Sequence, residues 1–248
     1  MTVQKCDNGI LLPAAFLLAL GIAAAGHFIT GGLTHFRSFD RSVTVKGLAQ
    51  MDVEADLVIW PIKHASTGDD LPAVQKEVEA NTQKTIAFLK SQGLTDADIV
   101  SRKLEVTDLL AQQYRSDGAI SSRFIVAENV IVRTVNVEAV DKAAQNIGEL
   151  LKQGVSVMRD PNSATGTPEY VFTKLNDIKP DMIAEATKNA RESAQQFASD
   201  SGAKVGGIKD AYQGMFEILP RDSNNAYQER QERYKTVRVV STLHFYLE

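Results

Sequence analysis

The chain has 248 residues, of which 44% are hydrophobic and 23% are charged, a globular composition with room for one large domain or two small ones. Its net charge of -4 argues against a surface for nucleic acid or anionic lipid, so we expect its partners to be proteins. The only cysteine, Cys6, excludes a disulfide within the chain.

The first predicted element is a membrane segment near the N-terminus. Residues 8–36 contain no Lys, Arg, Asp or Glu, and as a helix the apolar run 10–29 would cross the roughly 30 Å hydrocarbon core of a bilayer. We therefore expect a short segment at 1–9, a transmembrane anchor at 10–29 and a linker at 30–41. The anchor residues in the lipid bilayer are Ile10, Leu11, Leu12, Phe16, Leu17, Leu18, Leu20, Ile22, Phe28 and Ile29.

A cleaved signal peptide is the alternative for this segment. Lys5 would supply the basic start, and Ala23-Ala24-Ala25 offers a cleavage site. Against cleavage, the apolar run exceeds the roughly 7–15 residues of a signal core, and Asp7 cancels the charge of Lys5. One proline and two glycines within the run argue against a third interpretation, a buried core helix.

Two strands and a helix are predicted next. The strands lie at 42–50 and 53–65, and the second should be at a sheet edge, bulged or broken at Pro61, because proline cannot donate to a ladder. Asp70 can cap the helix that follows, and Gly93 suits its end. The residues at helical spacing are Val74, Val78, Thr82, Ile86 and Leu89.

A hairpin and a second set of elements complete the chain. Strands 99–114 and 123–135, joined by the turn sequence Ser116-Asp117-Gly118, should pair with each other. The remaining predictions are a helix at 138–153, a strand at 170–175, a helix at 178–199 and strands at 208–219 and 234–247. The apolar face of the long helix comprises Ile178, Met182, Ala186, Ala190, Ala194 and Phe197, and its alanines indicate close approach to a sheet.

The order strand-helix-strand-strand therefore occurs twice, with a helix between the two occurrences. We expect an α+β domain at 42–248 in which duplicated units form a mixed or antiparallel sheet with helices packed on one side.

Three segments of this domain resemble the SIMPL domain family, formerly a domain of unknown function in bacterial periplasmic and outer-membrane immunogenic proteins. They are the opening 42–57, the alanine-rich helix that continues into Ser201-Gly202-Ala203-Lys204 and Val205-Gly206-Gly207-Ile208, and the closing strand 237–246. The chain departs from the family pattern at Ala55, where proline is common, at Trp60-Pro61, and in a long charged excursion near the C-terminus.

The resemblance implies a bacterial envelope protein. Its location would be the inner membrane with the large domain in the periplasm, or the periplasm alone after signal cleavage. The family is linked to stress tolerance and to ring-shaped, channel-like oligomers, and it offers no established catalytic residue.

No residue pattern in the chain predicts a chemical site. Asp52, Glu54 and Asp56 alternate on a strand and could bind a divalent cation, but a solvated strand edge explains them equally well. The four histidines, His27, His35, His64 and His244, lack zinc-site spacing. Because nucleophile-elbow, phosphate-loop and dinucleotide motifs are also missing, we expect no cofactor, no metal and no enzymatic activity.

The charged excursion, residues 221–235, is the candidate contact site. It is either a solvated hairpin tip or a contact with an identical subunit or a partner protein. The contact has a physical basis, because alternating charges can set the register between two neighbours and tyrosines can anchor the interface. The candidate residues are Tyr227, Glu229, Arg230, Glu232, Arg233 and Tyr234. We expect a self-associating envelope protein; the alternatives are a binding module with a groove beside the sheet for an envelope ligand or partner protein, and an enzyme without recognisable motif.

Overall fold

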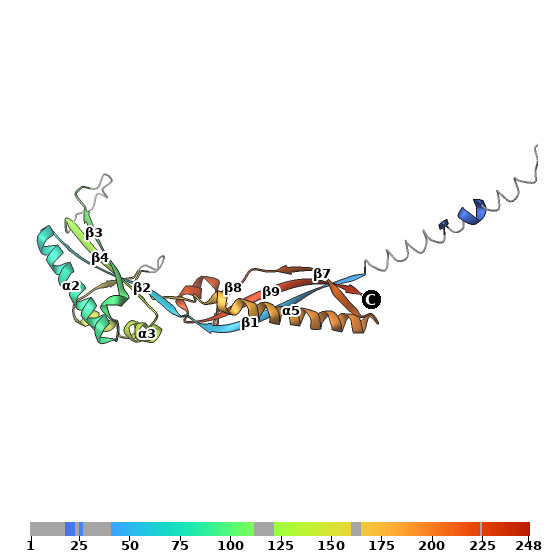
Figure 1. Cartoon of the computed structure of the whole chain (residues 1–248). Helices are drawn as coiled ribbons and strands as arrows, with labels where there is room; N and C mark the ends of the chain where they lie inside the picture. Colours follow the sequence, from blue (N-terminus) through green and yellow to red (C-terminus); the bar gives the residue numbers. More distant parts are fainter. Residues whose placement is uncertain (1–17, 23–24, 27–40, 112–121, 160–164, 224) are drawn as a thin grey trace, which may run out of the picture. The chain divides into compact units, whose positions relative to one another are not determined.

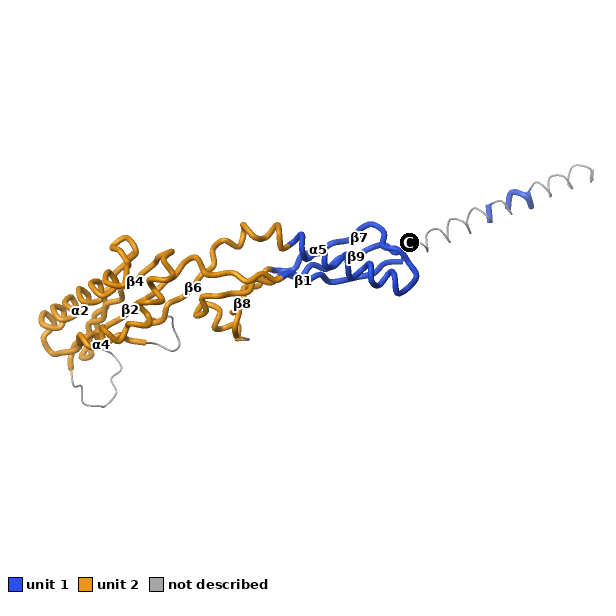
Figure 2. Tube along the Cα trace, turned by 90° about the horizontal axis from the view of Figure 1, so that it is seen from below, with its two compact units in different colours: residues 1–49, 183–215, 239–248 blue, residues 50–182, 216–238 orange. Residues whose placement is uncertain are grey.

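Antiparallel strand pairs and long helices make up the chain, as the computed structural model shows for residues 18–22, 25–26, 41–111, 122–159, 165–223 and 225–248 (Figure 1). The chain divides into unit 1, residues 1–49, 183–215 and 239–248, and unit 2, residues 50–182 and 216–238 (Figure 2). The predicted α+β class is confirmed. The predicted domain 42–248 contains residues of both units.

Unit 2 is built on a five-stranded sheet. Its strands are β2 (Leu57–Gly68), β3 (Ile99–Asp108), β4 (Phe124–Thr134), β5 (Val157–Met158) and β6 (Glu169–Val171). The order is β3-β4-β2, with the short β5 and β6 on the far side of β2, and every pairing is antiparallel. The predicted hairpin is confirmed in β3 and β4, while its turn residues, 116–118, lie outside the described residues. Among the described strands, β3 pairs only with β4.

Helices cover one face of this sheet. They are α2 (Leu71–Ser91), α3 (Val137–Gln145) and α4 (Gly148–Lys152), with a short 3-10 helix at Asp96–Asp98. Side chains alternate along a strand, so Val58, Trp60 and Ile62 of β2 point to the same side and enter one core with Phe88 of α2 and Leu150 of α4. The predicted placement of helices on one side is therefore correct for unit 2 (Figure 1).

Pro61 lies in an interior strand, contrary to the expectation of an edge or a break. The register of β2 with β4 runs without interruption through Pro61 and Ile131. On the other side of β2, the pairings with β6 and β5 leave out residues 60–62, and the Pro61 carbonyl accepts a hydrogen bond from the Gly166 N–H at 2.7 Å. The proline therefore faces the interrupted side, where no ladder donor is needed.

Two predicted elements differ in extent. The single helix expected at 138–153 is two helices, because α3 ends at the Asn146 cap and Gly148, a poor helix former, begins α4. The strand expected at 170–175 is the three-residue β6, which pairs with β2. In a duplicated order, this strand would lie next to β9 (Tyr234–Leu247). The strand found next to β9 is instead β1 (Ser42–Glu54).

In unit 1, the second half of α5 (Leu175–Asp200) packs on a sheet of β1, β9 and β7 (Val205–Gln213). Four buried alanines at four-residue spacing form its contact stripe, namely Ala186, Ala190, Ala194 and Ala198. A Cβ on Gly47 would lie 1.8 Å from the Ala186 carbonyl oxygen, so the predicted close approach of helix and sheet is correct. Phe197, predicted on this face, is 63% exposed because the stripe continues through Ala198.

The last predicted strand pair is split. The strand expected at 208–219 is β7 followed by β8 (Glu217–Pro220), and the Gly214 N–H between them donates to the Val240 carbonyl at 2.8 Å. In unit 2, β8 pairs antiparallel with the start of β9, and the charged excursion closes this hairpin with a 3-10 helix at Ala226–Gln231.

Of the predicted anchor, the structure describes Leu18, Leu20 and Ile22, which are helical and exposed. The other seven anchor residues lie outside the described residues. Within the described ranges, no helix combines the length and hydropathy needed to cross a membrane.

Candidate functional site

Most charged residues of the charged excursion make ion pairs inside unit 2. Arg233 donates from Nε to Glu54 and from Nη1 to Asp141, both at 2.6 Å. The Glu229 carboxylate lies 2.7 Å from Nζ of Lys235, which is fully buried. The excursion is therefore fixed to its own unit by these pairs.

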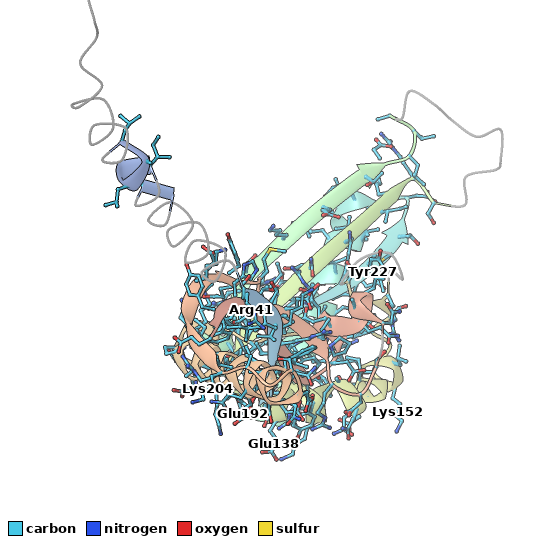
Figure 3. All side chains as sticks on the ribbon, turned by 90° about the vertical axis from the view of Figure 1, so that its right-hand side faces the viewer. Arg41, Glu138, Lys152, Glu192, Lys204 and Tyr227 are labelled. Carbon is cyan, nitrogen blue, oxygen red and sulfur yellow. The ribbon has the colours of Figure 1, made fainter. Side chains whose placement is uncertain are left out.

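Two tyrosines of the excursion differ in exposure. Tyr227 is 96% exposed (Figure 3), whereas Tyr234 packs against the guanidinium groups of Arg221 and Arg233, 4.4 and 5.5 Å from its ring centre. Arg230 makes a long ion pair, 3.4 Å, with Glu169, and Glu232 is half-buried. The contact role of all six residues stays a prediction.

The three alternating carboxylates do not form a shared site. Asp52 accepts a hydrogen bond from Thr236, Glu54 pairs with Arg233, and Asp56 accepts two from Thr173. Within the described ranges, no three Asp, Glu, His or Cys side chains lie close enough together to hold a metal ion.

The four histidines are also separate. His244 lies 3.7 Å from the Asp210 carboxylate in unit 1, and His64 is fully buried in unit 2. His27 and His35 lie outside the described residues.

A buried polar chain, not predicted from the sequence, connects α2 to the sheet of unit 2. Nε2 of His64 lies 3.1 Å from Oγ1 of Thr82, and that hydroxyl makes a hydrogen bond to the Glu128 carboxylate. The other oxygen of Glu128 accepts from Nε of Arg102 at 2.7 Å, and Arg102 also donates to Glu79 at 2.8 Å. His64 and Thr82 are fully buried and Glu128 nearly so.

Hydrogen-bond counting assigns the proton on His64. The Thr82 hydroxyl has one hydrogen, and its contacts with the Glu128 carboxylate and the Val78 carbonyl are both with acceptors. His64 Nε2 must therefore carry the hydrogen and donate to Thr82, which leaves Nδ1 unprotonated and without a partner among the described residues. Burial, aided by the positive charge of Arg102, lowers the pKa of His64 against the opposing effect of Glu128, so the ring is neutral.

We expect acid to weaken unit 2 through His64. The pKa of His64 is lowered in the folded chain, whereas in the unfolded chain it has the ordinary value of about 6.5. Below about pH 6.5, the unfolded chain therefore binds a proton at this residue that the folded chain does not bind. The free energy of unfolding should fall by about 1 kcal/mol between about pH 7.5 and about pH 5.5 on account of this residue. Urea unfolding of the wild type and of His64→Gln at both pH values tests this, because the variant lacks the loss; equal losses in both proteins would contradict it.

A groove opens beside this polar chain. Because α2 packs on β2 and β4, it leaves the same face of β3 uncovered. The groove between α2 and β3 has a volume of about 420 Å³ and is lined by Pro72, Gln75, Lys76, Val78 and Glu79 of α2, Arg102 and Leu104 of β3, and Glu128 of β4. Leu104 and Val106 of β3 are 50% and 52% exposed. One edge of β3 pairs with no described strand, and this edge with the two apolar side chains forms the candidate site, here called the β3 edge.

Residues 43–242 match the family model described as SIMPL, protein of unknown function (DUF541). The chain belongs to the SIMPL family. The resemblance seen in its three segments is thereby confirmed. No curated protein matches the chain. It is similar to the crystal structure of an uncharacterized conserved protein from Listeria innocua at 12% identity and a TM-score of 0.19, over 77% of this chain and 90% of that chain.

In this SIMPL chain, the β3 edge has the features of a strand-docking surface. An unpaired strand edge presents backbone N–H and C=O groups that another strand can bind, and the adjoining groove can take its side chains. The sequence predicted a strand at 99–114 but not its position at the edge, since the order of strands depends on tertiary pairing.

Proposed function

We propose that this SIMPL protein is anchored in the bacterial inner membrane by residues 10–29, carries its α+β domain in the periplasm, and self-associates. Its role would be structural and non-enzymatic, in the integrity or stress resistance of the envelope. The family and the length of the N-terminal apolar run support the location. Anchoring all copies in one plane favours assembly, because it raises their effective concentration.

The single observation that supports self-association is the β3 edge. β3 has ten residues, pairs on one side only among the described strands, and exposes Leu104 and Val106 beside an open groove. A long edge strand with apolar side chains invites pairing with another chain, unless charged side chains, proline, a bulge or a covering segment protect it. The charges on the outer face of β3 are of both signs, at Lys103 and Glu105, so they can pair with the opposite charges of a second copy.

A charge placed on the apolar face of β3 tests this proposal. We expect Leu104→Lys to convert the full-length protein, extracted in mild detergent, from an oligomer to a monomer by particle mass, because pairing at the β3 edge would bury the charge of the new lysine. Leu151→Lys is the matched control, since Leu151 is similarly exposed on α4 and outside the β3 edge. An unchanged oligomer mass for Leu104→Lys with an unchanged melting temperature would contradict the proposal.

The groove favours a second candidate, a periplasmic binding module for an extended segment of a partner protein. Its lining combines Lys76 and Arg102 with Glu79 and Glu128 and with apolar side chains, which suits a peptide with charges of both signs. A monomeric wild type whose melting temperature rises with added peptide would favour this candidate over self-association.

A further inference from the structure

We propose that two copies of this protein pair through β3 as antiparallel strands, with Leu104 of each copy at the two-fold axis. The proposal rests on the self-association proposed above and specifies its interface and register. The two five-stranded sheets of unit 2 would then join into one continuous sheet.

Symmetry limits the registers that are possible. Two identical strands paired edge to edge in antiparallel fashion are related by a two-fold axis perpendicular to the sheet, so the contact is self-complementary. Opposite residues of an antiparallel pair lie on the same face, and therefore the axis must pass between one residue of β3 and the same residue of its copy. The choice of register is the choice of that residue.

Charge selects Leu104 among the central residues of β3. An axis at Lys103 would place two lysines opposite each other, and an axis at Glu105 would place two glutamates there, both unfavourable. An axis at Leu104 places Lys103 opposite Glu105 of the copy, twice, by symmetry. In the same register, Ser101 lies opposite Thr107, a pair that can hydrogen-bond.

The charged pair is available for this contact. Lys103 is exposed and has no ion-pair partner among the described residues. Glu105 uses Oε2 to accept from Nζ of Lys63 at 2.6 Å, and its side chain is still 60% exposed. Its second oxygen can therefore accept from Lys103 of the copy.

The opposite face of the paired strands supplies the apolar contact. Leu104 lies on the side of α2, opposite Glu128 of β4, and would meet Leu104 of the copy. Val106 would lie opposite Arg102 of the copy, whose guanidinium is held by Glu79 and Glu128 and whose aliphatic part can contact the valine. Side chains exposed in the single chain are thereby covered by those of the second.

Cysteine cross-linking tests the register directly. In a Cys6→Ser background, the full-length Leu104→Cys protein in mild detergent should form a disulfide dimer under a mild oxidant, because the two Cβ atoms would lie about 5 Å apart. Val106→Cys is the matched control: it has the same face and exposure, but its two copies would lie roughly 14 Å apart. We expect dimer formation on a non-reducing gel to be about tenfold faster at position 104.

Lys103→Glu in the Leu104→Cys protein tests the charge argument. It should slow cross-linking about tenfold, because two attractive pairs become repulsive, while Lys152→Glu on the exposed end of α4 should not. Equal cross-linking at 104 and 106, or no effect of Lys103→Glu, would overturn the register. Absence of cross-linking in the Leu104→Cys protein, when the wild type is oligomeric, would overturn this interface and leave the proposed function standing, whereas a monomeric wild type would overturn both.

Discussion

Replacing Gly47 by alanine is expected to lower the free energy of unfolding by about 3 kcal/mol, because the new methyl group would overlap the backbone of α5. Its Cβ would lie 1.8 Å from the Ala186 carbonyl oxygen and 2.6 Å from the Ala190 backbone nitrogen. Neither atom belongs to a flexible side chain, so β1 and α5 must move apart and open the core of unit 1. Thermal unfolding followed by circular dichroism should show a midpoint lowered by about 8 °C.

Gly207→Ala is the matched control for that change. Gly207 lies in β7 of the same unit, and a Cβ there would meet nothing within 4 Å. We expect its melting temperature to stay within about 2 °C of the wild type. If Gly47→Ala melted like Gly207→Ala, the close packing of α5 on β1 would be wrong.

Glu128→Ala is expected to destabilise unit 2 by about 2 kcal/mol, since it removes the charged hydrogen-bond acceptor shared by the buried Thr82 and the partly exposed Arg102. Glu128 accepts hydrogen bonds from Thr82 and Arg102, and the hydroxyl of Thr82 in turn orders His64. Urea unfolding should therefore show a lower midpoint with little change in slope.

Glu79→Ala controls for the loss of charge, because Glu79 is the other carboxylate bound by Arg102. Its side chain is more than half exposed, so water replaces the lost partner and we expect a loss of about 1 kcal/mol or less. Equal losses for Glu79→Ala and Glu128→Ala would mean that the polar chain from His64 to Arg102 does not stabilise the fold.

Local patterns in the sequence predict much of this fold. The spacing of Val74, Val78 and Leu89 predicts α2, and the two apolar runs at 99–114 and 123–135 predict the β3 and β4 hairpin. Such elements depend on periodicity within one segment, which the sequence displays directly. The SIMPL resemblance likewise depends on local motifs and is confirmed.

Features that depend on tertiary pairing were mispredicted or missed. Pro61 predicted an edge strand, but β2 is an interior strand. It tolerates the proline because the strands on one side of it, β5 and β6, leave out residues 60–62. Phe197 was predicted as a core residue, but the buried alanines of α5 are spaced by four residues. Ala198 takes the next buried position, and Phe197 is exposed.

The polar chain beside the β3 edge could not be predicted from sequence patterns for the same reason. The polar chain joins β2, α2, β3 and β4 through residues that are 18 to 46 positions apart in the hydrogen-bonded pairs His64–Thr82 and Thr82–Glu128. The charged excursion was predicted as a solvated hairpin tip or a contact, and its partners within unit 2, such as Asp141 for Arg233, were missed because they come from distant segments. The predicted anchor lies mostly outside the described residues and stays a prediction.

Self-association of the membrane-anchored chain is the central claim, and the particle mass of the full-length wild type in mild detergent tests it most directly. The intact mass of the chain should be measured on the same sample. We predict a particle of two or more chains, each with the uncleaved mass of 27.1 kDa. A particle containing one chain, shortened near residue 26, would contradict both the assembly and the anchor.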